Sequence, residues 1–213
     1  MNSKSHVGFW LIVFLVAIFV VPYLVRGEQM RARMVTEVQQ VQDVLGANIG
    51  RTVVQTATAV YEGTVVASGL RAAMDQFQHT REDKQNARDV GSTLAVAAAE
   101  GADSYFDALG VQLYSIILRG TIVATWGLLL LPFAAAVLMD GFYSRAKKFE
   151  VLGFQNPTAF AASLHVAVAI SAAPLMYIVA PLAITPLFIP WWAVAAALPL
   201  SFAIQHMQPV LTR

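Results

Sequence analysis

Of the 213 residues, 57% are hydrophobic and 13% are charged, about half of the roughly 25% charge of a soluble globular domain. So few charges cannot cover a water-exposed surface, which excludes a soluble enzyme of ordinary build. The net charge of +1 gives no strong electrostatic field, so we expect no direct binding of nucleic acid. The chain has no cysteine, which excludes disulfides, thiolate metal sites and cysteine nucleophiles.

The first apolar stretch, residues 7–25, is longer than the apolar region of a signal peptide, which has about 7–15 residues. It ends in Pro22, Tyr23 and Arg26, without a cleavage pattern of small residues. We therefore interpret residues 1–26 as an uncleaved signal-anchor transmembrane helix.

Residues 27–117 are predicted to form a helical extramembrane segment. Apolar residues recur every three or four positions from Met30 to Val53, and a second stripe runs from Val60 to Phe77. This spacing is typical of amphipathic helices.

Glycines interrupt these helical patterns. For Gly46 and Gly50, two interpretations stay open: a seam of small residues that permits a close helix crossing, or a break between two shorter helices. The alanine-rich helix after residue 89 is expected to continue into the second span as one long rod, with breaks at Gly101 and Gly110.

Residues 118–213 are predicted to form a transmembrane domain of three helices. The second span covers residues 121–139, with a kink expected at Pro132. Arg119 is placed at the membrane surface, because a charge at the membrane centre costs at least about 2.5 kcal/mol. The third and fourth spans form a hairpin, and they cover residues 159–182 and 188–204.

The predicted fold class is all-α: a polytopic membrane protein with four transmembrane helices and the helical segment between the first and second of them. Basic residues near the span ends are almost balanced between the two sides. The loop 140–158 is short and basic, which favours a cytoplasmic location for this loop and for both termini. In a bacterial inner membrane, residues 27–117 then lie in the periplasm.

Motifs for catalysis are absent from the sequence: it has no nucleotide-binding glycine loop, nucleophile elbow, zinc-protease motif or dinucleotide fingerprint. We therefore expect no enzyme activity, no cofactor and no metal. His165 and His206 lie at similar predicted depths, so a bis-histidine haem or metal site is a geometric alternative. The favoured interpretation makes His165 a buried imidazole bonded to a neighbouring span and His206 an interfacial residue.

The stretch from Gln112 to Pro209 resembles a known family. Its second span ends in Val137-Leu138-Met139-Asp140-Gly141-Phe142, followed by Arg145, Lys147-Lys148-Phe149 and a loop with Gly153. A membrane hairpin with several prolines at its turn comes next. This plan is similar to that of membrane proteins from integrating conjugative elements and conjugative plasmids, whose domain is of unknown function. The resemblance implies an inner-membrane component of a DNA-transfer apparatus, encoded alongside the coupling ATPase that feeds DNA to a type IV secretion channel.

The leading hypothesis is a non-catalytic inner-membrane assembly subunit of this apparatus that supports or anchors the coupling ATPase. Expected partners are membrane lipid, other membrane or secretion-apparatus proteins, and further copies of the chain. The alternatives are a small pore or transporter subunit and a haem-binding redox subunit. The candidate partner-docking residues are Asp140, Gly141, Arg145, Lys147 and Lys148.

Overall fold

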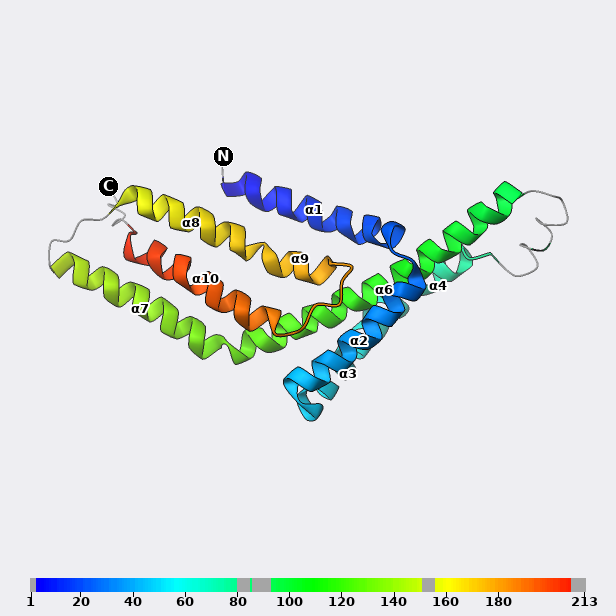
Figure 1. The fold of residues 1–213 in the computed structure, drawn as a ribbon, viewed down its shortest axis with the longest axis horizontal. Helices are drawn as coiled ribbons and strands as arrows, with labels where there is room; N and C mark the ends of the chain where they lie inside the picture. The colour runs from blue at the N-terminus through cyan, green and yellow to red at the C-terminus, as the bar shows by residue number, and fades with distance from the viewer. Residues whose placement is uncertain (1–2, 80–84, 86–92, 151–155, 208–213) are drawn as a thin grey trace. The chain divides into compact units, whose positions relative to one another are not determined.

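The computed structural model describes residues 3–79, 85, 93–150 and 156–207, and it contains no strand within these ranges. The all-α fold class is therefore confirmed. The helices shown in Figure 1 are α1 (Ser3–Leu24), α2 (Gly27–Leu45), α3 (Ala47–Tyr61), the π-helix η1 (Glu62–Val66), α4 (Leu70–Gln76), α6 (Thr93–Leu129), α7 (Leu131–Glu150), α8 (Pro157–Ser171), α9 (Ala173–Val179) and α10 (Phe188–Gln205).

The chain divides into two compact units. The first consists of Met1–Ile122 and Met176–Pro186, and the second of Val123–Leu175 and Leu187–Arg213. The first unit thus contains α1 to α4 and most of α6, and the second contains α7, α8 and α10.

Within the first unit, α1 ends at a sharp turn of 114° into α2. Gly27 opens α2 against α6, and a Cβ atom there would lie 2.4 Å from Asp107 Oδ2, so only glycine fits without displacement. A small apolar core holds this corner, with Val21, Met30 and Ala108 buried together. Burial of side chains from α1, α2 and α6 in one cluster fixes the turn.

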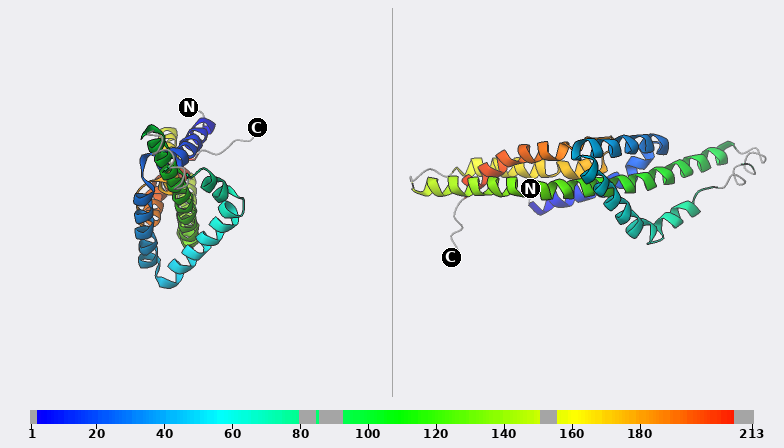
Figure 2. Two further views of the ribbon diagram at one scale, coloured as in Figure 1. Left: turned by 90° about the vertical axis from the view of Figure 1, so that its right-hand side faces the viewer. Right: turned by 90° about the horizontal axis from the view of Figure 1, so that it is seen from below.

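The first apolar stripe is divided between two helices. Gly46 has φ +80°, a backbone conformation that favours glycine, and it separates α2 from α3. A Cβ atom at Gly50 would lie 2.7 Å from the Cα atom of Gln42, so the two helices also approach closely there. The interpretation of a break between two helices is therefore correct for Gly46. The close approach occurs at Gly50 alone, so the two glycines do not form a seam together. In the left view of Figure 2, the chain descends along α2 and climbs back through α3, η1 and α4.

The long helix α6 runs without interruption through Gly101 and Gly110, so the breaks predicted there are wrong. Gly110 is buried beneath the Arg71 guanidinium, because a Cβ atom at Gly110 would lie 2.4 Å from Arg71 Nη1. The guanidinium of Arg71 thus occupies the space that a side chain at position 110 would take. The interruption comes instead at Leu130, two residues before Pro132, which has no N–H to donate.

Within the second unit, α10 packs against both α7 and α8. The last turn of α8 loses a hydrogen bond, because Pro174 has no N–H for the carbonyl of Ile170. The indole Nε1 of Trp192 donates to that carbonyl at 2.8 Å. Trp192 therefore fastens α10 to α8 at the point where the helical hydrogen bonding is interrupted.

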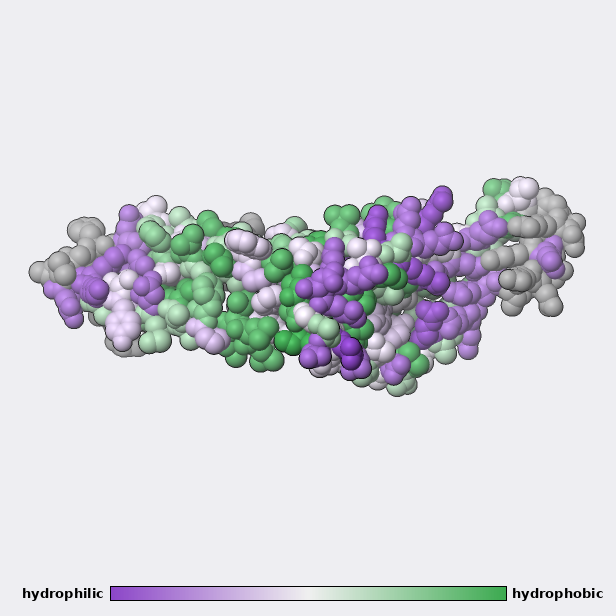
Figure 3. Space-filling model, turned by 60° about the horizontal axis from the view of Figure 1, so that its bottom comes forward, coloured by the Kyte–Doolittle hydropathy of each residue, from purple (hydrophilic) through white to green (hydrophobic). Residues whose placement is uncertain are grey.

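Three helices are long and apolar enough to cross a membrane: Thr93–Leu129, Pro157–Val179 and Phe188–Gln205, with the bent pair of α1 and α2 as a fourth candidate. Large apolar side chains are exposed along α1, α7, α8 and α10. On the face that Figure 3 shows, hydrophobic residues gather over the second unit, with hydrophilic residues at the end where α7 finishes. Surfaces of this kind are unfavourable in water and indicate association with a membrane.

Candidate functional site

Arg119 of α6 and Glu37 of α2 form a buried ion pair inside the first unit, with side chains only 4% and 1% exposed. Nε of Arg119 donates to Glu37 Oε1 at 2.7 Å, and Nη2 donates to Oε2 at 3.0 Å. This two-pronged geometry is the strongest that an arginine and a carboxylate adopt. The prediction that the Arg119 side chain reaches outward is therefore wrong, because its guanidinium points into the protein. The depth of Arg119 in the membrane stays a prediction.

Arg119 also donates to backbone carbonyls at and beyond the end of α9. Nη1 lies 3.0 Å from the carbonyl oxygen of Tyr177, and Nη2 lies 2.7 Å from that of Leu182. Because Pro181 has no N–H, the carbonyl of Tyr177 lacks the donor that a continuing helix would supply. The guanidinium replaces this donor, and a cation at a helix C-terminus is favourable.

Two further side chains complete the site. Gln112 Nε2 donates to the carbonyl of Val179 at 3.0 Å, and Arg33 donates to the carbonyl of Pro181. Arg119 also donates to the carbonyl of Ala180. The site thus engages the main-chain carbonyls of Tyr177, Val179, Ala180, Pro181 and Leu182. The free space in this site is about 10 Å³, at the lower limit for a single water molecule.

This arrangement is suited to fastening and not to proton transfer. An arginine in a protein does not give up its proton, and both oxygens of Glu37 are engaged by Arg119. The site therefore holds the segment Met176–Pro186 against α2 and α6. One sequence signal could have identified Glu37: it stands one helical turn from Met34 and from Val41, on the apolar side of α2.

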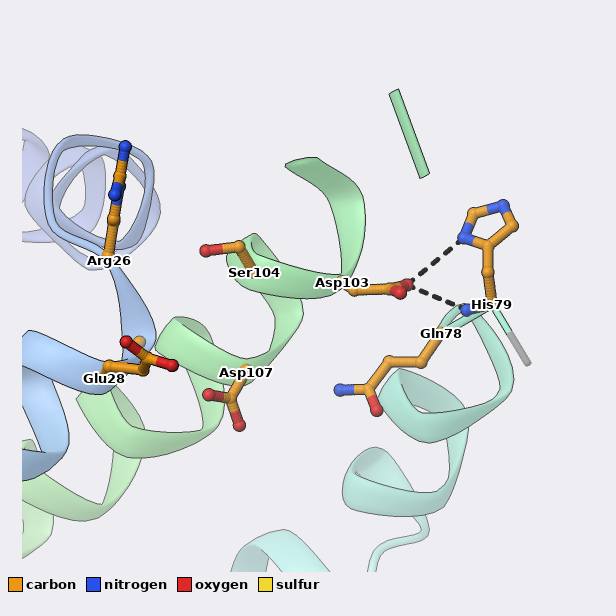
Figure 4. Close-up of a pocket in the computed structure, with 8 residues that line it drawn as sticks. Arg26, Glu28, Gln78, His79, Asp103, Ser104 and Asp107 are labelled. Atoms are coloured by element: carbon orange, nitrogen blue, oxygen red, sulfur yellow. Dashed lines mark hydrogen bonds and ion pairs between the residues drawn. The ribbon is translucent and has the colours of Figure 1, made fainter. Parts of the chain in front are cut away.

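The first unit also contains a polar recess of about 530 Å³. It lies between the start of α2, the residues that follow α4, and the side of α6. Figure 4 shows His79 and Asp103 side by side in its lining, joined by hydrogen bonds. The main-chain N–H of His79 donates to Asp103 Oδ1 at 2.8 Å, and Nδ1 of the ring lies 3.2 Å from the same oxygen. Asp107 in the lining is paired with Arg31. Two of the carboxylates in the recess thus already have partners.

The five candidate docking residues lie on α7 and not in a loop, because α7 continues to Glu150. The predicted loop 140–158 is therefore helical over its first part, and residues 151–155 lie outside the described residues. Gly141 is buried against Ile204, and Asp140 accepts a hydrogen bond from Ser201. Docking by these residues stays a prediction.

Among the three cations of this set, Lys147 is exposed and Arg145 is half-buried. Lys148 Nζ lies 3.1 Å from Nε2 of His206, to which it donates. Partial burial, and then the neighbouring ammonium of Lys148, lower the pKa of His206 below its usual range.

Of the two histidines, His165 differs from expectation. His165 is exposed on α8, so its predicted burial is wrong. His206 follows the end of α10, where its ring stacks on Phe202. Among the described residues, no group of three or more histidines and carboxylates is placed to hold a metal ion.

Comparison with known families decides the relationship. The family described as "IncC plasmid conjugative DNA transfer protein DtrJ-like" matches residues 25–211, which cover α2 through α10. The chain belongs to the DtrJ-like family. The resemblance to proteins of conjugative elements is thereby confirmed, and it extends over the helical segment 27–117 as well as the C-terminal half.

The DtrJ-like family gives this chain a role in conjugative DNA transfer, and it is not a known enzyme family. Its apolar helices indicate membrane association. No curated protein and no solved structure matched the chain.

Proposed function

We propose that this chain is a non-catalytic inner-membrane assembly subunit of a conjugative DNA-transfer apparatus and that it supports or anchors the coupling ATPase. It crosses the membrane four times with both termini in the cytoplasm. The observation that carries the proposal is the family match over residues 25–211 of a chain with exposed apolar helices. A membrane-embedded member of a DNA-transfer family is well placed to hold other components at the membrane.

The buried pair of Arg119 and Glu37 supports an anchoring role. Ionisable residues within membrane segments often serve proton or ion transport. Here the guanidinium is fully engaged by a carboxylate and by main-chain carbonyls. Such a fixed charge stabilises one arrangement of helices, which is what a scaffold for partners needs.

The alternative of a pore finds little support in the hydroxyl side chains that would have to line it. Thr121, Ser163 and Ser171 each donate to a carbonyl four residues earlier in their own helix, at 2.9, 2.7 and 2.8 Å. Hydroxyls in apolar helices commonly make such local bonds, which need no water. The structure of these helices therefore favours packing against lipid or protein.

The decisive experiment pairs a mating assay with capture from membranes. A plasmid that lacks the gene is complemented with the tagged wild-type chain or with the variant Lys147→Ala, Lys148→Ala. We expect the wild type to restore transfer and to retain the coupling ATPase in mild detergent, and the variant to lose both. Normal transfer by the variant would show that Lys147 and Lys148 at the end of α7 do not form the docking surface.

Topology must be measured on the same variant, because lysines near a span end also set its orientation. Reporter fusions after Gln78 and after Glu150 should lie on opposite sides of the membrane, with Gln78 in the periplasm. Retention of Arg145 should keep this topology unchanged. If the wild type restores transfer but never retains the coupling ATPase, the anchoring role is refuted and the family role stands.

A further inference from the structure

An apolar groove of about 370 Å³ lies in the second unit, between the end of α6, α7 and α10. All of its lining residues are apolar or glycine, and they include Leu130, Phe133 and Val137 on one side and Ile189, Ala196 and Leu200 on the other. A groove of this kind within apolar helices accepts hydrocarbon and excludes polar ligands.

The length of the groove suits an extended hydrocarbon chain. Its lining on α10 extends from Ile189 to Leu200, twelve residues whose eleven helical steps rise about 16 Å. A single extended hydrocarbon chain fits, and the length is close to half of the roughly 30 Å hydrocarbon core of a bilayer.

Cations stand beyond one end of the groove. The face of α7 that carries Val137 continues through Gly141 to Lys148, about three helical turns further on, with Arg145 beside it. Helical side chains tilt toward the N-terminus of their helix, so these two cations lean back toward the groove. Asp140 is exposed and accepts a hydrogen bond from Ser201. The surface beyond the groove on the side of Arg145 and Lys148 thus complements an anion.

At Gly141 the helices touch, since a Cβ atom there would lie 3.0 Å from Ile204. The lining of the groove therefore ends at Val137 on α7 and at Leu200 on α10, on the side of the cations.

From this geometry we propose that the groove holds one acyl chain of an anionic phospholipid, whose phosphate lies against Arg145 and Lys148. Basic residues beside membrane helices recognise anionic headgroups, and the groove adds a specific seat for the chain. This site is distinct from the general lipid contact that any exposed apolar helix makes.

Native mass spectrometry tests the proposal. The purified full-length chain in mild detergent is mixed with equal amounts of phosphatidylglycerol and phosphatidylethanolamine. We expect one retained phosphatidylglycerol per chain, and loss of the adduct in Ala196→Phe, which fills the groove. Val194→Phe adds the same ring to α10 at an exposed position outside the lining, and it should retain the lipid.

Headgroup recognition is tested separately. Arg145→Gln with Lys148→Gln should abolish the preference for phosphatidylglycerol, whereas Lys147→Gln should keep it. Each variant is compared by melting temperature and gel filtration, and if Ala196→Phe misfolds, Ala197→Leu fills the same groove with less bulk. Equal retention of the two lipids by the wild type, or an unchanged adduct in a folded groove-filling variant, would overturn the proposal.

Discussion

The substitution Glu37→Gln should destabilise the protein strongly, because it leaves the guanidinium of Arg119 buried without a carboxylate. Removing one partner of a buried ion pair costs about 3–5 kcal/mol. For a chain of 213 residues, each kcal/mol lowers the melting temperature by about 2–4 °C. We therefore expect a melting temperature roughly 6–20 °C below that of the wild type. The matched change Asp75→Asn breaks an exposed helical pair with Arg71 and should cost about 0.5 kcal/mol.

Tryptophan fluorescence during a thermal ramp, in one detergent for all variants, measures this difference. The double variant Glu37→Met, Arg119→Met removes both charges and should recover part of the loss, because neither charge is left buried alone. The recovery is incomplete because the carbonyls of Tyr177 and Leu182 lose their donor. If Glu37→Gln melts within about 2 °C of the wild type, as expected of Asp75→Asn, the buried pair does not hold the first unit together and the reasoning is refuted.

Three further predictions concern α3, α6 and the end of α10. Gly50→Ala should lower the free energy of unfolding by about 1–3 kcal/mol, because its Cβ atom would meet the backbone of Gln42 at 2.7 Å, and the same thermal ramp measures it. Gly101→Ala should instead raise the free energy of unfolding by up to about 1 kcal/mol, since a Cβ atom at position 101 meets nothing within 4 Å. Equal effects of Gly50→Ala and Gly101→Ala would contradict the packing described. Lys148→Gln should raise the pKa of His206 toward its usual range by removing a neighbouring positive charge, which histidine-selective NMR titration would detect as a shifted midpoint.

Local patterns in the sequence predicted local structure well. The apolar spacing of Met30, Val41 and Val53 predicted helices, and these three side chains are buried. The positions of helix breaks were less predictable, because packing decides them. Gly110 remains inside α6 where the side chain of Arg71 covers it.

The candidate site was the least predictable part. Hydropathy places an isolated arginine such as Arg119 at a membrane surface, because it has no information about a partner 82 residues away. The carbonyl acceptors are harder still to foresee, since main-chain groups leave no signature in a sequence. Only Pro181 indicated that a carbonyl nearby would lack a donor.

The buried arginine also has a consequence for biogenesis. Its carboxylate partner precedes it by 82 residues, whereas its carbonyl partners follow it by 58 to 63 residues. During synthesis, α6 is therefore complete before any of the carbonyl acceptors for its guanidinium exist. The segment from Tyr177 to Leu182 is needed to finish the site, so a chain that ends before this segment carries a cation with incomplete hydrogen bonding. Incompletely folded chains of this kind are removed by chaperones and proteases in cells.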